Sequence, residues 1–300
     1  MASTILINKK SGAVTQQGEA VLREKIQHAI KDEADDIRFL DAESLIEELK
    51  KVPAGKKIII GGGDGTIRSA AHILKNKKIP FGILPLGTMN LFANDLSLEQ
   101  DFLKLAAAYR DTEEIVIDSA TVNNELFLCN AMVGVPSVVA EEREKERSKE
   151  NIFKWLQLVK KGVDSLSNGR PQRFSITCNG NTQEKFIKAA VIANNEYEDM
   201  GGVGVFRKKS LADGKLSIYT INPEGALETV GLLSRLALGN WHESAGLGYF
   251  ECPEVRLFTK RRWVSVLLDG EIYSFRAPLF FKSDPASLRL IVPRKQKEGS

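Results

Sequence analysis

The first third of the chain alternates short apolar runs with longer stretches in which apolar residues recur at helical spacing. The short runs predict strands over residues 4–8, 36–40, 57–60 and 81–84. Between them, residues 21–30 and 45–49 place apolar side chains on one helical face, and Asp41 is a potential N-cap for the second stretch. The third strand is apolar on both faces, which indicates a parallel sheet covered by helices. Such sheets bind ligands at the carboxyl ends of their strands.

The pattern changes near residue 118, after which strand candidates follow one another directly. They cover residues 126–131, 173–178, 186–193, 215–221, 255–258, 263–268 and 276–281. This succession predicts a mostly antiparallel β domain, interrupted by helical stretches over residues 141–163 and 226–238. We therefore expect an α/β domain of residues 1–118, followed by a β-sandwich domain of residues 119–286.

Composition and charge narrow the classes of function. Of the 300 residues, 43% are apolar, and 42 basic against 39 acidic side chains give a net charge of +3. This charge is too mild to indicate nucleic acid as a partner, although it permits weak attraction to an anionic surface. The three cysteines, Cys129, Cys178 and Cys252, are far apart, which argues against a disulfide framework or a zinc site. Without an apolar run of roughly 20 residues or a signal-peptide pattern, we expect a cytoplasmic protein.

The strongest local motif is the glycine loop Gly61-Gly62-Gly63-Asp64-Gly65-Thr66. It follows a strand and precedes a helical pattern, so its backbone amides and the helix dipole together predict a phosphate site. The loop is neither a Walker motif nor a dinucleotide fingerprint. Asp64 would repel phosphate unless a divalent cation intervenes, which points to a magnesium–nucleotide complex. The alternative is a tight turn that simply needs glycines.

A second loop, residues 84–90, follows the next strand and turns into a short helical segment over residues 91–96. Its Thr88 is placed either to donate to a phosphate or to cap that segment, and capping is the commoner role for such a residue.

The two loops together resemble the catalytic domain of the diacylglycerol kinase family, which includes bacterial lipid kinases and sphingosine and ceramide kinases. The resemblance is carried by Gly-Gly-Asp-Gly-Thr at residues 62–66 and Pro-Leu-Gly-Thr-x-Asn at residues 85–90. Asn8-Lys9-Lys10-Ser11-Gly12 resembles the family's first turn, and residues 211–216 and 268–271 resemble two later motifs in the expected order. The resemblance implies an α/β domain like that of NAD kinases, then a β-sandwich, with the active site in the cleft between them. It also implies that residues 287–295 return to the first domain.

The resemblance further implies a set of site residues. Those expected to bind ATP are Asn8, Gly61, Gly62, Gly63, Asp64, Gly65, Thr66, Gly87, Thr88 and Asn90. The Asp213 carboxylate and the main-chain carbonyls of Ser210 and Lys215 would hold Mg²⁺. Glu271 would be the general base, with Asp269 and Asp64 as further catalytic carboxylates. The chain departs from the family at Lys9, at Arg68-Ser69, and at Leu91, where the family usually has aspartate.

The segment Leu-Asp-Gly-Glu at residues 268–271 has two interpretations from the residues alone. A regular strand would place Asp269 and Glu271 on one face, whereas a turn at Gly270 is favoured by its composition. Without the resemblance, a plain hairpin turn is the better explanation.

We predict an ATP- and Mg²⁺-dependent kinase in phospholipid biosynthesis that phosphorylates a hydroxyl of a diacylglycerol-like lipid. The alternatives are an NAD kinase-like enzyme and a non-catalytic nucleotide or lipid sensor. Lys154, Lys160 and Lys161 accompany the apolar residues of 152–159, so this segment either packs a core or makes a transient contact at the inner membrane surface. A homodimer is one option for the assembly state. His28, His72 and His242 do not cluster and carry no role.

Overall fold

The computed structural model describes residues 3–30, 34–134, 166–198, 207–238 and 244–294. The chain divides into two compact units, one formed by Met1–Ile117 with Ala286–Ser300 and the other by Asp118–Pro285. They are called unit 1 and unit 2 below. The segment expected to be helical over residues 141–163 and the residue His242 lie outside the described residues.

Unit 1 is built on a parallel sheet in the order β2–β1–β3–β4. Its strands are β1 (Ser3–Asn8), β2 (Ala34–Leu40), β3 (Ile58–Gly62) and β4 (Phe81–Pro85). Its helices are α1 (Gly12–Gln17), α2 (Glu19–Ile30), α3 (Ala42–Lys51), α4 (Asp64–Lys77), α5 (Leu91–Asp95) and α6 (Phe102–Ala108). Every residue of β3 and β4 is buried, as expected for strands with apolar side chains on both faces.

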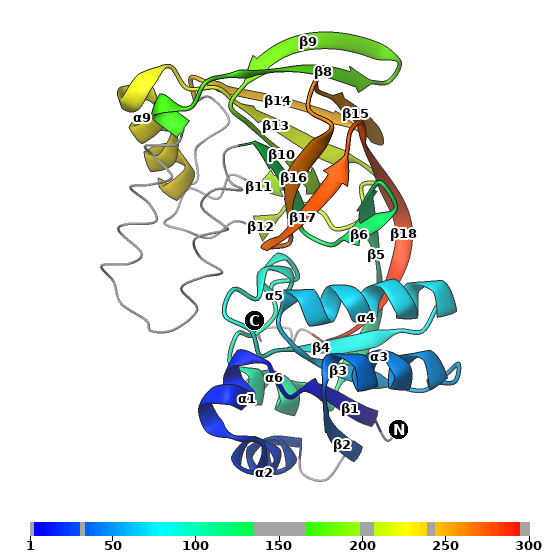
Figure 1. Cartoon of the computed structure of the whole chain (residues 1–300). Helices are drawn as coiled ribbons and strands as arrows, with labels where there is room; N and C mark the ends of the chain where they lie inside the picture. Colours follow the sequence, from blue (N-terminus) through cyan, green and yellow to red (C-terminus); the bar gives the residue numbers. More distant parts are fainter. Residues whose placement is uncertain (1–2, 31–33, 135–165, 199–206, 239–243, 295–300) are drawn as a thin grey trace, which may run out of the picture. The chain divides into compact units, whose positions relative to one another are not determined.

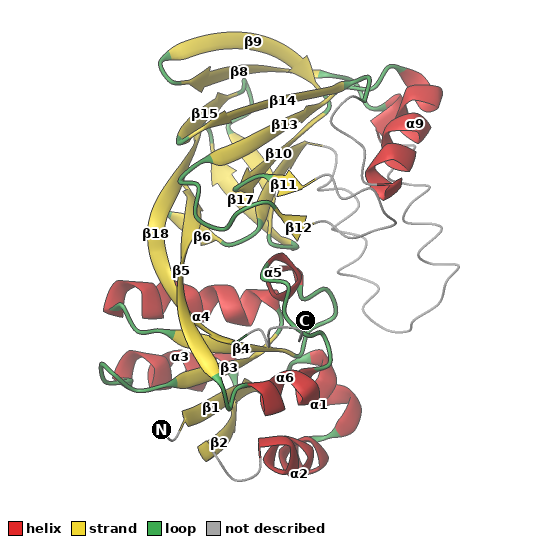
Figure 2. Ribbon diagram, turned by 180° about the vertical axis from the view of Figure 1, so that it is seen from behind, coloured by secondary structure: helices red, strands yellow, loops and turns green. Residues whose placement is uncertain are grey.

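Helices cover both faces of this sheet, as Figures 1 and 2 show. Ile5 and Ile7 of β1 pack with Leu22 and Ile26 of α2 on one face. Helices α3 and α4 pack against each other and against β1 and β3 on the other face. Asp41 accepts a hydrogen bond from the Ser44 amide at 2.9 Å, which confirms the predicted N-cap of α3.

Two strands run through both units, namely β5 (Thr112–Val122) and β18 (Leu279–Pro293). In unit 1, β18 pairs in parallel with β4 at Leu290 and Phe81. Beside it, the Tyr109 hydroxyl donates to the Ile83 carbonyl at 2.9 Å and accepts from the Ile83 amide at 2.8 Å. Burial raises the pKa of Tyr109. This one side chain therefore satisfies both backbone groups of Ile83, as a neighbouring strand would.

Unit 2 contains two antiparallel layers. The six-stranded sheet has the order β14–β13–β10–β7–β16–β17. Its strands are β7 (Asn130–Gly134), β10 (Ala189–Asn194), β13 (Leu216–Ile221), β14 (Leu247–Cys252), β16 (Trp263–Leu268) and β17 (Glu271–Arg276). The second layer joins β5 and β18 with β6 (Glu125–Phe127), β8 (Gln172–Cys178), β9 (Asn181–Ile187) and β15 (Glu254–Phe258). The short pair β11 (Tyr197–Glu198) and β12 (Arg207–Lys208) and the helix α9 (Gly225–Leu238) complete the described part.

The core of unit 2 is made by alternate residues of the two layers. Phe174 and Ile176 of β8 and Phe281 of β18 meet Ile192 of β10 and Val266 of β16 in one buried cluster. The fold class predicted from the sequence is therefore confirmed, with a parallel α/β sheet and an antiparallel β-sandwich. Within the described ranges, no helix is long and apolar enough to cross a membrane.

Three strands that the sequence predicts as continuous are broken. The predicted strand 186–193 is divided at Lys188, where the chain passes from β9 in one layer to β10 in the other. The predicted strand 126–131 is divided between β6 and β7 for the same reason. The predicted strand 276–281 breaks at Pro278, which has no amide hydrogen to donate to a ladder. Hydrophobicity gives no sign of the first two breaks, because buried residues lie on both sides of each.

The packing of β18 predicts the effect of truncating its apolar side chains. Leu290 is 1% exposed, so Leu290→Ala should lower the free energy of unfolding by about 2–5 kcal/mol. Leu227 on α9 is 88% exposed, and Leu227→Ala should change the free energy of unfolding by less than about 0.5 kcal/mol. Urea denaturation followed by circular dichroism measures both. Similar small losses in the two variants would contradict a core position for Leu290.

Candidate functional site

The glycine loop joins β3 to α4, and Gly63 is the N-cap residue in an extended conformation with φ −84° and ψ 176°. None of Gly61, Gly62 and Gly63 has a positive φ. A Cβ on Gly61 would lie 2.9 Å from Cγ1 of Ile7, and one on Gly62 would lie 2.6 Å from Cβ of Thr66. Gly61 and Gly62 are therefore required by space, and the tight-turn explanation does not account for them.

The second loop follows β4 and approaches the first at backbone distance. A Cβ on Gly87 would lie 2.6 Å from Cα of Gly63, which leaves room for glycine alone. The Gly87 amide donates to Oδ1 of Asn90 at 2.9 Å, and Asn90, with φ 47°, is the N-cap residue of α5. Thr88 is exposed and Asn90 holds the cap position, so of the two roles considered for Thr88 the helix cap does not apply.

Two side-chain hydrogen bonds join these loops to their surroundings. Oδ1 of Asp64 accepts from the Phe92 amide of α5 at 3.2 Å. Nδ2 of Asn8, at the carboxyl end of β1, donates to Oγ1 of Thr66 at 2.8 Å. The structure thus brings the predicted nucleotide-binding residues together at the carboxyl ends of β1, β3 and β4. These are Asn8, residues 61–66, Gly87, Thr88 and Asn90.

The amino end of α4 determines the electrostatic character of this place. Its first-turn amides have no partner within the helix, and the helix dipole favours negative charge in front of them. Asp64 lies in the same first turn and contributes a carboxylate. An anionic phosphate can lie against these amides when a cation offsets the Asp64 charge.

In unit 2, Asp269 and Gly270 form the two-residue turn between β16 and β17. Their φ angles are 47° and 87°, as a type I′ hairpin turn requires, and Leu268 pairs with Glu271 across it. The hairpin-turn interpretation is therefore confirmed, and a regular strand that carries Asp269 and Glu271 on one face is wrong. Glu271 is half-buried, and its Oε2 accepts from the Tyr273 hydroxyl at 3.3 Å.

The Asp269 carboxylate is 3% exposed and faces the backbone that precedes β7. Its Oδ2 accepts from the Leu128 amide at 2.8 Å. Its Oδ1 accepts from the amides of Cys129 at 2.8 Å and Asn130 at 3.2 Å. Both oxygens are therefore committed to main-chain donors, and they fix the hairpin turn against residues 128–130.

The loop of residues 210–215 is held by two buried residues that sequence reasoning missed. Asp118, 2% exposed, accepts from the Gly214 amide at 2.7 Å, and its own amide donates to the Leu211 carbonyl at 2.8 Å. Asn195, 1% exposed, accepts from the Asp213 amide at 3.2 Å and donates its amide to the Lys215 carbonyl at 3.1 Å. The available signal was polar residues directly after the apolar runs 115–117 and 191–193.

A buried lysine connects this loop to the hairpin region. Nζ of Lys208, a residue 6% exposed, donates to the carbonyls of Cys129 at 3.3 Å and Asn195 at 3.2 Å. The ammonium lies 3.5 Å from the ring centroid of Tyr197, whose hydroxyl accepts from Nδ2 of Asn130 at 3.1 Å. The predicted residues of unit 2 therefore belong to one hydrogen-bonded region.

The predicted metal ligands all lie on the loop of residues 210–215. The Asp213 carboxylate is exposed, and the Lys215 carbonyl keeps one lone pair after accepting from Asn195. Oγ of Ser210 accepts from the Ala212 amide at 3.1 Å, which leaves the Ser210 carbonyl as the candidate ligand. Among the described residues, no three acidic, histidine or cysteine side chains gather as a metal cluster. One carboxylate with main-chain carbonyls and water suits Mg²⁺, which seldom uses an all-protein cage.

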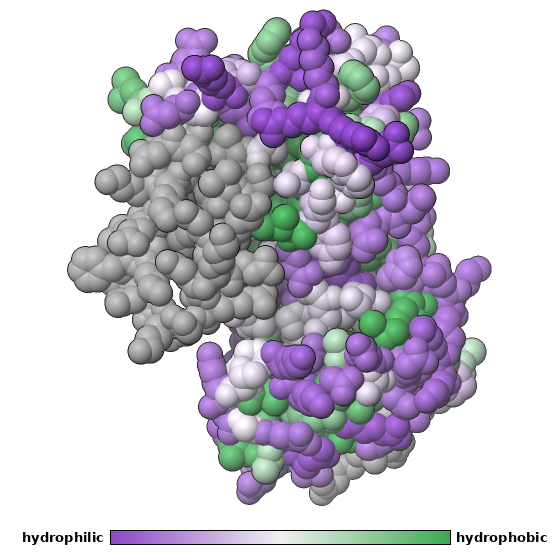
Figure 3. Space-filling view, in the orientation of Figure 1, coloured by the Kyte–Doolittle hydropathy of each residue, from purple (hydrophilic) through white to green (hydrophobic). Residues whose placement is uncertain are grey.

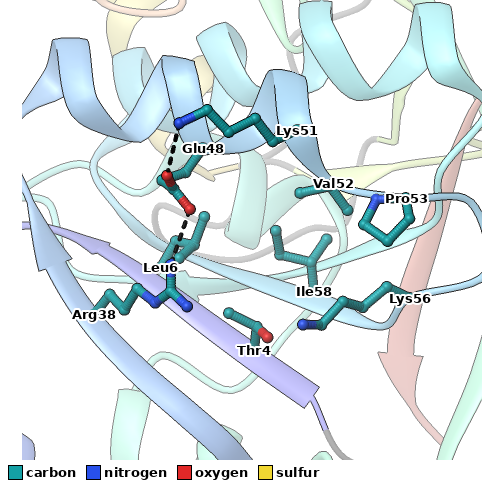
Figure 4. Close-up of a pocket in the computed structure, with 9 residues that line it drawn as sticks. All are labelled: Thr4, Leu6, Arg38, Glu48, Lys51, Val52, Pro53, Lys56 and Ile58. Carbon is teal, nitrogen blue, oxygen red and sulfur yellow. Dashed lines mark hydrogen bonds and ion pairs between the residues drawn. The ribbon is translucent and has the colours of Figure 1, made fainter.

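A pocket of about 150 Å³ lies elsewhere in unit 1, among the starts of β1 and β3 and the end of α3 (Figure 4). Thr4, Leu6 and Ile58 line it from the sheet, and Glu48 pairs with Arg38 at 2.9 Å and with Lys51 at 3.2 Å at its rim. None of the predicted site residues lines this pocket, which lies toward the amino ends of the strands.

Fold and site geometry define a protein with a parallel α/β unit that carries a glycine loop, and with a β-sandwich. Residues 2–122 match the family model of the diacylglycerol kinase catalytic domain. Residues 130–292 match the YegS C-terminal NAD kinase beta sandwich-like domain. The chain belongs to the diacylglycerol kinase catalytic-domain family with this C-terminal domain, as the sequence resemblance predicts.

Relatives agree with this assignment. A Staphylococcus epidermidis protein, provisionally named a lipid kinase, is 25% identical over 243 residues, which are 80% of this chain and 77% of that protein. A Klebsiella pneumoniae protein named "Probable lipid kinase YegS-like" is 36% identical over 144 residues, 44% of this chain and 45% of that protein. A crystal structure described as a diacylglycerol kinase from Bacillus anthracis has the same fold, with a TM-score of 0.68 and 18% identity over 97% of this chain and 96% of that one.

The contact between the two loops of unit 1 predicts a sharp difference between two glycine substitutions. Gly87→Ala places a methyl group against the Gly63 backbone, and should lower the free energy of unfolding by about 1–3 kcal/mol through overpacking. Gly231→Ala on α9 meets no atom within 4 Å and should be neutral or stabilising by up to about 1 kcal/mol. Thermal unfolding of the two variants checks the pair. A Gly87→Ala protein as stable as the wild type would mean that the loops do not approach so closely.

Proposed function

We propose that this protein transfers the γ-phosphate of ATP, as its Mg²⁺ complex, to a hydroxyl of a diacylglycerol-like lipid. The catalytic-domain match implies the use of ATP. The observation that carries the rest of the proposal is an apolar row across the six-stranded sheet that ends beside Glu271.

The nucleotide half of the proposal rests on unit 1. In this proposal the ATP phosphates lie against the amides at the amino end of α4, where the helix dipole favours them, and Gly87 leaves the space for the two loops to meet. Asn8 orients the Thr66 hydroxyl through their 2.8 Å hydrogen bond, while Thr88 and Asn90 belong to the second loop that closes on the first. Asp64 keeps one carboxylate contact to the Phe92 amide and serves the cation that accompanies ATP.

The metal-binding part of the proposal rests on the Asp213 carboxylate, with the carbonyls of Ser210 and Lys215. Bound there, Mg²⁺ would neutralise charge that develops on the transferred phosphoryl group. Asp118 and Asn195 are positioning residues in this proposal. Asp118 bonds to the loop backbone on both sides of Asp213, and Asn195 bonds to the Asp213 amide and the Lys215 carbonyl.

The acceptor part of the proposal rests on the face of the six-stranded sheet that is turned away from the sandwich core. The cross-strand register places one apolar or aromatic residue from every strand in a single row: Ile272, Leu267, Met132, Val191, Tyr219 and Tyr249. Their neighbours along each strand, such as Val133, Ile192 and Ile218, fill the core on the other face. A row of this kind suits the hydrocarbon of a lipid and does not suit a polar nucleotide acceptor. It therefore favours a lipid kinase over an NAD kinase-like enzyme.

The general base in this proposal is Glu271. It adjoins Ile272, which begins the apolar row, so a lipid lying on the row would carry its hydroxyl toward this carboxylate. Both oxygens of Asp269 accept from main-chain amides, whereas Glu271 is half-buried and its Oε2 accepts from the Tyr273 hydroxyl. Asp269 then acts by fixing the turn that presents Glu271.

Replacing Glu271 tests this assignment. Glu271→Gln keeps size and removes basicity, so turnover of diacylglycerol in mixed micelles with radiolabelled ATP should fall about 10²- to 10⁴-fold. ATP affinity, measured by calorimetry, should stay within about twofold. Glu254→Gln, an exposed glutamate on β15, is the matched control and should keep full turnover. Weakened ATP binding with normal turnover at saturation in Glu271→Gln would rule out the base role.

The apolar row gives a separate test of acceptor class. Leu267→Gln should raise the KM for long-chain diacylglycerol by about tenfold or more, the worth of one buried leucine side chain, and leave the KM for ATP unchanged. Val21→Gln, at a 45% exposed valine on α2, controls for added polarity. An unchanged lipid KM in Leu267→Gln, or turnover with NAD in place of lipid, would remove the lipid acceptor from the proposal.

A further inference from the structure

One end of the sandwich in unit 2 combines exposed aromatic rings with unpaired positive charge. Residues 259–262 connect β15 to β16, and three consecutive cations, Lys260, Arg261 and Arg262, are exposed there. Phe258 and Trp263 flank them and are 51% and 58% exposed. Together with Arg276, these residues are called the basic end.

The charge at this end is concentrated. Arg276 pairs with Trp263 across the β16–β17 ladder, so it adds a fourth cation beside the three of the turn. Among the described residues, none of these four cations forms an ion pair. The four cations of the basic end exceed the formal net charge of the whole chain, which is only +3. In Figure 3, strongly hydrophilic groups gather over the part of the surface where Figure 1 shows β15 and β16.

The aromatic rings point outward from both layers of the sandwich. Val255 and Leu257 of β15 face the core, so Phe258 faces away from it. Val264 and Val266 of β16 also face the core, so Trp263 faces away on the opposite side. On β18, the 49% exposed Phe280 lies opposite Arg256, whose guanidinium is 4.7 Å from its ring centroid.

The backbone under the basic end is fixed by Asn123. Nδ2 of Asn123 donates to the carbonyls of Arg276 at 3.2 Å and Pro278 at 3.3 Å, and its Oδ1 accepts from the Phe280 amide at 2.8 Å. The Ala277 amide donates to the Arg262 carbonyl at 3.0 Å. The cations and rings therefore project from a preformed edge, and little order is lost when they bind a surface.

We propose that the basic end docks on an anionic lipid bilayer, with the four cations among the lipid phosphates and the rings of Phe258 and Trp263 at headgroup depth. Aromatic rings with a polar surrounding prefer this interfacial layer, and each basic residue near an anionic surface adds attraction. A nucleic acid fits less well, because a stacking platform needs its rings on one face, whereas these rings leave opposite faces of the sandwich.

The docking surface complements the proposed reaction, since a lipid acceptor must be reached from the water side. Trp263 and Leu267 lie on the same outward face of β16, so the basic end and the apolar row share this face, at opposite ends of the strand. Vesicle binding requires neither ATP nor turnover, and so the docking proposal and the proposed function can fail separately.

Flotation with phosphatidylcholine vesicles, with and without phosphatidylglycerol, tests the proposal on the full chain. The wild type should bind the anionic vesicles and lose binding at high salt. The variant K260Q/R261Q/R262Q should bind about 100-fold more weakly, since each cation contributes about fivefold. The control K25Q/K50Q/K104Q removes the same charge from exposed lysines of unit 1 and should bind within about twofold of the wild type. Circular dichroism establishes that both variants are folded.

Three outcomes would overturn the proposal. The first is no binding to anionic vesicles at low salt, and the second is equal weakening in the two triple variants. The third is tighter binding to a single-stranded oligonucleotide that is lost in K260Q/R261Q/R262Q, which would assign the basic end to nucleic acid. Trp263→Ser distinguishes the contribution of the ring from that of the charges. The weaker vesicle binding of this variant should persist at high salt, where the attraction of the cations is screened.

Discussion

The arrangement of unit 1 depends on the approach of two backbones, at Gly63 and Gly87, too close for any side chain between them. Parallel pairing of Gly62 with Pro85 brings the ends of β3 and β4 to the same level, and the loops that follow have to share one small space. Glycine is the residue that allows this, here through volume and not through unusual dihedral angles. Once the loops are in contact, the hydrogen bonds from Phe92 to Asp64 and from Gly87 to Asn90 can form. The amino end of α4 is thereby left facing outward, where a phosphate can reach it.

In unit 2, buried polar groups fix the positions of the loops, as the closely spaced glycines do in unit 1. Asp118, Asn195, Lys208 and Asp269 are almost fully buried, and they form hydrogen bonds with backbone amides and carbonyls. Such groups would be costly to bury without partners, so each of them fixes the course of the loop that it bonds. Two residues of the predicted site, Asp213 and Glu271, remain more accessible beside this network. The network therefore separates residues that shape the site from residues that can meet a substrate.

Local pattern was sufficient to predict the parts of the structure that depend on nearest neighbours. The parallel strands, the Asp41 cap, the glycine loop and the hairpin turn at Asp269 follow from hydrophobic period, capping chemistry and turn composition. The partners of Asp269, about 140 residues away along the chain, could not be derived in this way. From the sequence alone, Lys208 would be assigned to the surface. Only the tertiary fold brings its ammonium group to the carbonyls and the aromatic ring that it contacts. The break at Lys188 could not be predicted from hydrophobicity, because the buried residues continue where the chain passes from one sheet to the other.

The return of β18 to unit 1 also has a consequence for biosynthesis. The residue that pairs with β4 is Leu290, so the edge of a sheet begun by residue 3 is completed only after nearly 290 residues have been made. Unit 2 is contiguous in sequence, and all of it emerges from the ribosome before the last strand of unit 1. The nascent chain must therefore hold an unfinished α/β sheet, with one edge of β4 still open, while the sandwich is assembled. Tyr109 is made early enough to occupy part of that edge during this interval.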